Sequence, residues 1–426
     1  MISACPKRAV LAALRPEPDF SGLASLPAPE SKAGARFLRW LDRSGLALLF
    51  FRQLQKHDVS LRVAPGLQFA LHRRHERNFE RTADMLGEAL RLCRAFRERG
   101  LAVAALKGFT LTPDFCDHPF LRHQVDFDFL VAPDDILAAA EVLRAIGYFA
   151  SRVNQTSETS FLTPLQHIPT SNDDLYTRQT QRQVDLHVSL WDPCPWLPLE
   201  APQNCLQSAV CRSTCGVDYS GLALQDAFLF QVLHAFRHSL RSWVRLSWLF
   251  EIGRCLQNHH GDETLWALVI RRAGPTRLMK SACAFVLGLV HCLFQIPIPG
   301  PLEDWSEEAM TDSLCAWLDH FAVDWSIADW PGSLKNLFLT REFIPNGHLR
   351  RNYWRSRLLP GKTQTSLGTP PVAGAREFVE WQAARARYVT ERGIVHLKDM
   401  LALPWHGLRW KRALRSSRRL AFRAAC

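Results

Sequence analysis

The sequence predicts an α/β fold, more narrowly α+β, in which a small mixed β-sheet is flanked by N-terminal helices and followed by a largely helical C-terminal half. Residues 125–131 and 184–190 alternate polar and apolar side chains with the two-residue period of a strand. Residues 71–99 carry apolar side chains at helical spacing, and helical patterns dominate from residue 222 onward. Strand patterns enclosed by helical patterns indicate a sheet-containing core between helices.

The length of the chain sets the number of structural units. It has 426 residues, of which 47% are hydrophobic and 22% charged, and this leaves ample apolar chain for a buried core of two or three units. We predict five segments: a loosely ordered leader rich in proline and alanine (1–30), N-terminal helices (31–100), the sheet core (101–200), a helical domain (220–330) and a C-terminal helical segment with a basic tail (331–426).

Helices precede the predicted sheet. Residues 32–56 repeat apolar side chains at helical spacing, and the longer helix over residues 71–99 ends at Gly100, a common residue type after a helix. A short apolar strand over residues 101–106 follows and leads into Lys107. The turn from helix into strand is a typical start of an α/β unit.

Two predicted strands place carboxylates on one face of the sheet. In residues 125–131, Asp126 and Asp128 project from one face. The opposite face carries Val125, Phe127, Phe129 and Val131 and is apolar enough to pack on a core. Residues 184–190 repeat the pattern, so Asp185 joins the other two acids if the strands are neighbours.

Three neighbouring carboxylates point to a cation. Like charges raise one another's pKa unless a positive charge lies between them. Mg²⁺ is the simplest candidate because it prefers carboxylate and phosphate oxygens. Three acids on two strands suit a pair of such ions, which clamp the attacking and leaving oxygens in phosphoryl or nucleotidyl transfer. The alternative is a strand whose acids only face solvent.

Beyond the first acidic strand, helix and strand patterns alternate before the chain becomes helical. Pro133 begins a helix over residues 136–146, Gly147 closes it, and strand-like sequence follows over residues 148–153. The helices predicted further along are one or two over residues 226–258 and one each over residues 264–273, 276–294 and 377–392.

These residues resemble the uncharacterised bacterial nucleotidyltransferase family of the DNA polymerase β superfamily. The matching motifs are Lys107-Gly108, Arg122, Asp126-x-Asp128, Gly147-Tyr148 and Asp185-x-His187. Further matches in a later helix are His234, Trp243, Arg245-Leu246 and Trp248-Leu249. The resemblance is closest over residues 70–260.

The resemblance implies a nucleotidyltransferase core that uses Mg²⁺, with two ions expected, and a nucleoside triphosphate to modify an unidentified acceptor hydroxyl. The implied catalytic and metal-binding residues are Asp126, Asp128 and Asp185. In the family pattern the third of these acids also helps to activate the acceptor. The implied nucleotide-binding residues are Lys107, Gly108, Arg122 and His187.

Two positions depart from the family pattern. Better-known superfamily members carry Gly-Ser in the phosphate-binding turn, where this chain has Lys107-Gly108-Phe109-Thr110. Gly108 still allows backbone N–H groups to approach a phosphate, and Lys107 adds a positive charge. Glu251 stands in the later helix where an aspartate is expected. Neither change removes one of the three carboxylates.

Several polar residues admit two interpretations. Arg122 either pairs with a triphosphate or neutralises the nearby acids. Lys107 either contacts phosphate or forms an ion pair with an acid of the first strand. His187 either orients Asp185 or binds substrate.

One later helix carries four potential cations on one face. They are His234, Arg237, His238 and Arg241, at positions i, i+3, i+4 and i+7. This face either closes over the nucleotide phosphates or forms a polar stripe toward solvent or another helix. The nearby Trp243 and Trp248 are interpreted as core residues.

The net charge of +11 favours acidic partners. Much of the excess lies in the tail, which has no acid after Asp399. The basic residues of the tail are Arg409, Lys411, Arg412, Arg415, Arg418, Arg419 and Arg423. Nucleotide, nucleic acid and an anionic membrane surface are all candidate partners, and a solvated tail is the simpler interpretation.

This charge supports an alternative function. A catalytically silent nucleotidyltransferase-like scaffold would bind RNA or another anionic partner through the tail, with a steep salt dependence and no turnover. A toxin-like transferase that modifies tRNA or a protein is a third hypothesis. The sequence does not select the acceptor.

Cysteine usage and hydropathy bear on the compartment. The twelve cysteines form no C-x-x-C pair, and the closest group, Cys205, Cys211 and Cys215, has no fourth ligand at zinc-like spacing. Free thiols in a reducing compartment are therefore expected. The apolar stretch over residues 281–298 contains His291 and ends at prolines, as a buried helix does. We expect a cytoplasmic protein without a transmembrane segment.

Overall fold

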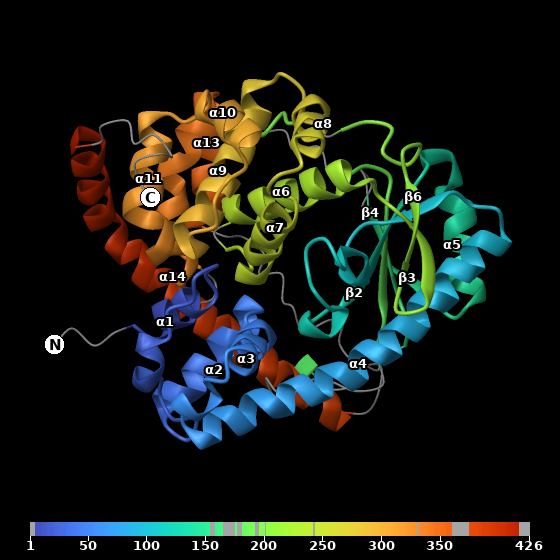
Figure 1. Cartoon of the computed structure of the whole chain (residues 1–426), viewed down its shortest axis with the longest axis horizontal. Coiled ribbons are helices and arrows are strands. Elements are labelled where there is room, and N and C mark those ends of the chain that lie inside the picture. Colours follow the sequence, from blue (N-terminus) through green and yellow to red (C-terminus); the bar gives the residue numbers. More distant parts are fainter. Residues whose placement is uncertain are drawn as a thin grey trace.

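The computed structural model describes residues 5–153, 158–164, 175–176, 181–191, 196–200, 202–241, 243–329, 332–359 and 375–416. Within these ranges, fourteen α-helices accompany one seven-stranded mixed sheet, and the helices dominate the C-terminal half (Figure 1). The predicted fold class is therefore confirmed.

The helices fall into three groups along the chain. Before the sheet lie α1 (Pro6–Ala13), α2 (Lys32–Ser44), α3 (Ala47–Lys56) and α4 (Pro65–Glu98). Between strands lies α5 (Ile136–Ala145). The C-terminal half contains α6 (Leu224–Leu240), α7 (Leu246–Asn258), α8 (Glu263–Ala273), α9 (Arg277–Phe294), α10 (Gly300–Glu307), α11 (Asp312–Ser326), α12 (Thr340–Phe343), α13 (Gly347–Leu358) and α14 (Ala375–Ser416).

The sheet has the spatial order β3-β4-β5-β2-β1-β7-β6. Its strands are β1 (Val103–Ala105), β2 (Asp126–Val131), β3 (Phe149–Val153), β4 (Glu158–Leu162), β5 (Gln183–His187), β6 (Val210–Thr214) and β7 (Val217–Gly221). β2 pairs with β1 antiparallel and with β5 parallel. The two acid-bearing strands are therefore neighbours at the centre of the sheet.

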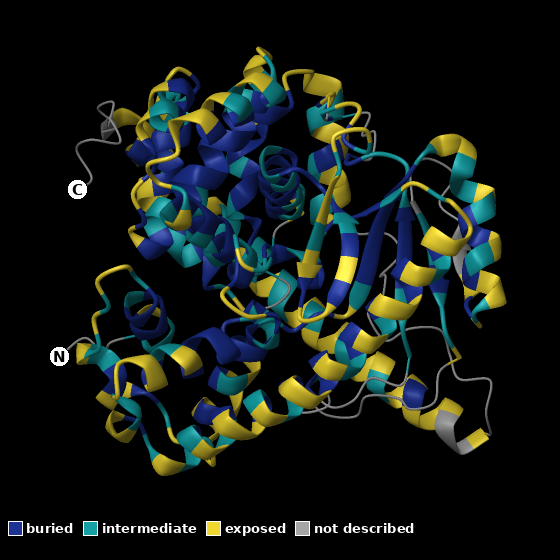
Figure 2. Cartoon of the chain, turned by 45° about the vertical axis from the view of Figure 1, so that its right-hand side comes forward, coloured by how far each residue is buried: buried dark blue, intermediate teal, exposed yellow. Residues whose placement is uncertain are grey.

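The two faces of the sheet pack against different layers. Phe127, Phe129 and Val131 are buried on one face in a cluster with apolar residues of α4 and α5. Phe96 of α4 meets Phe129 edge-on, with ring centroids 5.2 Å apart. The opposite face, which carries the acids, turns toward the helical half, and the central strands are largely buried (Figure 2). Of the predicted apolar face, Val125 alone is exposed, because it precedes the strand.

The N-terminal segment differs from its prediction. Where we predicted a loosely ordered leader, α1 buries Val10 and Leu11 in the larger core cluster. Lys7 Nζ donates a hydrogen bond to the carbonyl oxygen of Ile327 at 2.8 Å. The prolines that suggested disorder, at positions 16, 18, 27 and 29, all follow α1, whose own Pro6 occupies the first turn, where proline is well tolerated. The other segment boundaries stay predictions.

Three further elements were not fully predicted. Gly45 adopts a left-handed conformation with φ of 75° and separates α2 from α3, where one helix was expected. The hairpin formed by β6 and β7 was not predicted. The helix predicted over residues 377–392 is part of the longer α14, and the tail residues 417–426 lie outside the described ranges.

The apolar helix α9 is a core element, as predicted. By length and composition it could cross a membrane, but 72% of its apolar window is buried inside the protein. In the part of the chain that the structure describes, α9 is the one helix that passes this test of length and hydropathy.

Candidate active site

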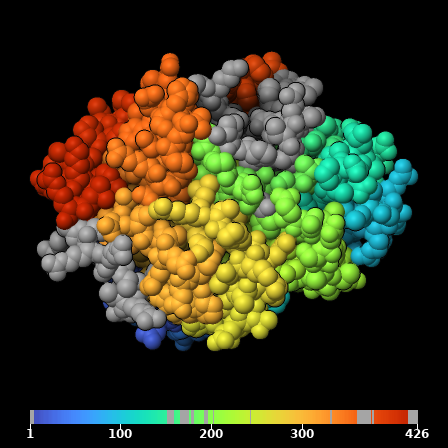
Figure 3. Space-filling model, turned by 90° about the horizontal axis from the view of Figure 1, so that it is seen from above, coloured from blue at the N-terminus to red at the C-terminus, as the bar shows by residue number. Residues whose placement is uncertain are grey.

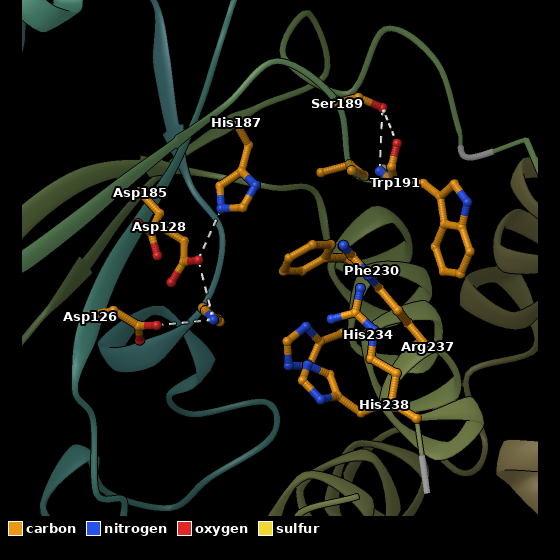
Figure 4. Close-up of a pocket in the computed structure, with 13 residues that line it drawn as sticks. Asp126, Asp128, Asp185, His187, Ser189, Trp191, Phe230, His234, Arg237 and His238 are labelled. Carbon is orange, nitrogen blue, oxygen red and sulfur yellow. Dashed lines mark hydrogen bonds and ion pairs between the residues drawn. The ribbon is translucent and has the colours of Figure 1, made fainter. Parts of the chain in front are cut away.

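Three carboxylates converge at the centre of the sheet (Figure 4). The parallel register of β2 and β5 places Asp128 opposite Asp185, and Asp126 lies two residues earlier on the same face. One oxygen from each carboxylate lies within 4.8 Å of the others. Asp128 and Asp185 are buried, and Asp126 is half-buried. The cluster predicted from strand alternation is therefore present.

Lys107 lies between two of these acids. It follows β1, which is antiparallel to β2, and its Nζ lies 3.2 Å from Asp128 Oδ1 and 3.5 Å from Asp126 Oδ2. Burial alone would lower the pKa of Lys107, but the three carboxylates outweigh it and the pKa is raised. Lys107 is therefore an ammonium that balances part of the acidic charge, which is one of its two predicted roles.

Two side chains of β5 support the carboxylates. The His187 ring contributes Nε2 to a hydrogen bond with Asp128 Oδ1 at 3.0 Å, and Gln183 Nε2 donates to both oxygens of Asp185 at 2.9 and 3.1 Å. Burial would raise the pKa of Asp128, but Lys107 and His187 together lower it. Asp128 is thus an ionised carboxylate held by two nitrogen groups.

The cluster fits a divalent cation. Lys107 balances only one of three negative charges. Asp128 Oδ2 is buried and, among the described residues, has no hydrogen-bond partner. An all-oxygen donor set of carboxylates is the set that Mg²⁺ prefers. These residues can therefore hold such an ion.

A cavity of about 240 Å³ separates the acids from α6. Across it from the acids, α6 presents His234, Arg237 and His238 (Figure 4). Arg241, which follows the last residue of α6, also lines the cavity. The remaining lining residues are Ser189, Leu190, Trp191 and Phe230, which had not been predicted. Phe230 lies one turn before His234, so the helical spacing that revealed the cations could also have revealed it.

The two histidines of α6 are neutral at neutral pH. Burial, with smaller contributions from His238 and Lys107, lowers the pKa of His234 well below its usual value. Burial, followed by Arg241 and Lys107, lowers the pKa of His238 to about 3. Trp248 packs edge-on against both rings, at centroid distances of 4.5 and 4.8 Å, and also contacts the core. The arginines therefore supply the positive charge of this wall.

Arg122 does not line the cavity. Its Nε donates to Glu251 Oε1 of α7 at 2.8 Å; Glu251 is buried, and the Arg122 side chain is 10% exposed. Burial raises the pKa of Glu251 although Arg122 opposes the shift. Arg122 thus has a role that sequence reasoning missed: it ties the segment before β2 to α7. The residue that departs from the family pattern, Glu251, is its partner.

Gly108 is likewise not among the residues that line the cavity. Its φ of 81° is in the left-handed region, and an added Cβ would lie 2.4 Å from Gln124 Nε2. That amide nitrogen donates to the backbone oxygen of Asp126 at 2.8 Å. The need for glycine at this position therefore follows from the turn and from Gln124, which supports the start of the acid strand.

Comparison with known proteins identifies a related family. The family described as "uncharacterised nucleotidyltransferase" matches residues 31–295, which is more than half of the chain. The matched region contains all seven strands and every residue that lines the cavity. No curated protein and no solved structure matches the chain.

Proposed function

Because the chain belongs to the uncharacterised nucleotidyltransferase family, we propose that it transfers a nucleoside monophosphate from a nucleoside triphosphate to an acceptor hydroxyl, in the manner of the DNA polymerase β superfamily. The observation that carries this proposal is the cluster of Asp126, Asp128 and Asp185 facing a basic helix across one cavity. A triphosphate with bound cations needs an acidic wall and a basic wall, because carboxylates hold the cations and guanidinium groups pair with phosphate oxygens.

The three carboxylates would hold Mg²⁺, with two ions proposed. Bound ions would neutralise charge on the phosphates and on the attacking and leaving oxygens. In the transfer, the acceptor oxygen bonds to the α-phosphorus while the bond from that phosphorus to the bridging oxygen breaks, and pyrophosphate leaves. Asp185, whose carboxylate Gln183 orients, is the proposed acceptor of the hydroxyl proton.

The other lining residues have distinct proposed roles. Arg237 and Arg241 bind the outer phosphates, and Lys107 and His187 hold Asp128 in place. The apolar part of the lining, Leu190, Trp191 and Phe230, is the proposed site of the nucleobase. Gly108 and Arg122 support the site from behind the lining.

We also propose that the protein works in the cytoplasm. None of the ten cysteines in the described part of the chain forms a disulfide, and most of them are buried. A protein exposed to an oxidising compartment usually pairs its cysteines. Fractionation of the producing cells would test this proposal.

The proposed function is tested by calorimetric titration of each nucleoside triphosphate in the presence of Mg²⁺. We expect binding by the wild type and none by the Asp126→Asn/Asp128→Asn variant. The matched control is Asp134→Asn/Asp135→Asn, which removes two charges just beyond the same strand, outside the cavity lining. This control should bind as the wild type does.

A second measurement addresses the chemistry. Release of pyrophosphate from the preferred triphosphate, with water as a slow acceptor, should be lost in Asp128→Ala while the melting temperature stays close to that of the wild type. Turnover by that folded variant would contradict the proposal. A wild type that binds no triphosphate but binds RNA with a steep salt dependence would instead support the silent scaffold.

A further inference from the structure

The long helix α14 has two apolar faces, of which the protein covers one. On the covered face, Trp410 stacks on Phe338 with ring centroids 5.8 Å apart, and Ala413 is buried. Asp399 accepts hydrogen bonds from the backbone N–H of Leu334 and the hydroxyl of Ser333. These contacts fix which side of α14 faces the protein.

The outer face carries an apolar stripe, defined as Ile394, Leu397, Leu401, Trp405 and Leu408. Each of these side chains is at least 50% exposed, and Leu401 and Trp405 reach 73% and 66%. At 3.6 residues per turn the five lie within an arc of about 80°, roughly half a turn away from Trp410. Figure 3 shows the C-terminal part of α14 at one edge of the molecule. The stripe is therefore an outward-facing surface of the described structure.

Basic residues border this stripe. Arg412 and Arg415 continue its spacing toward the end of the helix, and Lys398 and Lys411 lie beside it, all four of them exposed. The last acid of the chain, Asp399, points inward to Ser333 and Leu334. An apolar centre that includes a tryptophan, with a basic border, is the pattern of a helix that lies in a membrane interface.

We propose that α14 binds an anionic phospholipid surface through the apolar stripe, with the helix axis in the plane of the membrane. Its basic border complements anionic headgroups. A second copy of the chain would bring the same positive charges together and repel. RNA would leave the aliphatic side chains unused, since unpaired bases stack on aromatic groups. Charge and side-chain chemistry thus favour a membrane over both alternatives.

Flotation of the full chain with vesicles tests this proposal. We expect binding to vesicles of phosphatidylcholine and phosphatidylserine and weak binding to phosphatidylcholine alone. Leu401→Glu/Trp405→Glu should lower the partition coefficient at least about tenfold, because it places charges at the centre of the stripe. The matched control is Leu61→Glu/Leu137→Glu, which adds the same charges at side chains that are 92% and 73% exposed on other elements.

A second variant separates charge from apolar contact. Lys398→Gln/Lys411→Gln should weaken binding to the anionic vesicles several-fold and reduce its salt dependence. Melting temperatures of all variants should match the wild type, since the altered side chains are exposed.

Four results would overturn the proposal. The first two are equal flotation of the stripe variant and the wild type, and no flotation of the wild type. The third is self-association of the lipid-free wild type that the stripe variant abolishes, which would identify the stripe as an interface between copies. The fourth is stripe-dependent binding of a single-stranded RNA that competes with the vesicles, which would identify RNA as the partner.

Discussion

Removal of Arg122 should destabilise the fold through the partner it leaves behind. In Arg122→Met, Glu251 keeps its buried position on α7 but loses the guanidinium that lies 2.8 Å away. Breaking a buried ion pair by removing one partner costs about 3–5 kcal/mol, because a charge is left without compensation. The double variant Arg122→Met/Glu251→Leu should recover most of this loss, since replacing both partners by apolar groups is close to neutral.

The loss depends on pH in a direction that the structure sets. Burial already raises the pKa of Glu251 from its usual 4.5, and without Arg122 the pKa rises further. A carboxyl with a raised folded-state pKa keeps its proton while the unfolded chain ionises. Stability of Arg122→Met therefore falls as pH rises from about 4.5 to the folded-state pKa, by about 1.4 kcal/mol per unit of pH. The variant should be closest to the wild type in mild acid.

Urea unfolding followed by circular dichroism, near pH 5 and near pH 8, measures both effects. The free energy of unfolding of the single variant should lie further below that of the wild type near pH 8 than near pH 5. The free energy of unfolding of the double variant should differ from that of the wild type by a small amount that is the same at both pH values. A cost below about 1 kcal/mol for the single variant near pH 8, or a double variant as unstable as the single one, would refute the reasoning about the buried pair.

Two further predictions concern the cavity wall and the turn behind it. His238 has a pKa of about 3 in the fold against 6.5 in the unfolded chain, so its contribution to stability is present above pH 6.5 and is lost as pH falls. Between pH 6.5 and about 5, the free energy of unfolding measured in urea should therefore fall by about 2 kcal/mol less for His238→Asn than for the wild type. An equal dependence of this free energy on pH in the two proteins would contradict the prediction. Gly108→Ala should cost roughly 2–4 kcal/mol from its left-handed φ and its clash with Gln124. When Gln124 is already replaced by alanine, Gly108→Ala should lower the free energy of unfolding by at least about 1 kcal/mol less, as measured by thermal unfolding. An equal loss in both backgrounds would show that the clash with Gln124 does not contribute.

The central part of the fold was predictable because it depends on local periodicity. Asp126, Asp128 and Asp185 sit in strands whose apolar neighbours alternate with them, and alternation fixes which side chains share a face. The shared face of His234, Arg237, His238 and Arg241 follows in the same way from helical spacing. The convergence of the three acids needed one further assumption, that the two strands are neighbours, which the parallel pairing of β2 and β5 fulfils.

Features that depend on distant contacts were not predictable in this way. The partner of Arg122 lies 129 residues further along the chain, so no local pattern reveals it. The hairpin of β6 and β7 has a largely exposed first strand, which lacks a strong apolar signal. Whether Lys107 meets a phosphate or a carboxylate depended on the distance between neighbouring strands, which the sequence does not encode locally.

The position of α1 has a consequence for the order in which the chain can fold. α1 leaves the ribosome before α9, yet it packs in the core beside α9, and Lys7 bonds to Ile327, 320 residues away. Such a contact closes a very long loop, and long-range contacts of this kind form late and slow folding. The part of α1 that contacts α9 therefore stays uncovered until α9 has been synthesised, although η1 (Ser21–Ser25) and α3 already pack on other parts of α1. Nascent chains that stall before residue 277, where α9 begins, lack this contact and would be natural clients for chaperones.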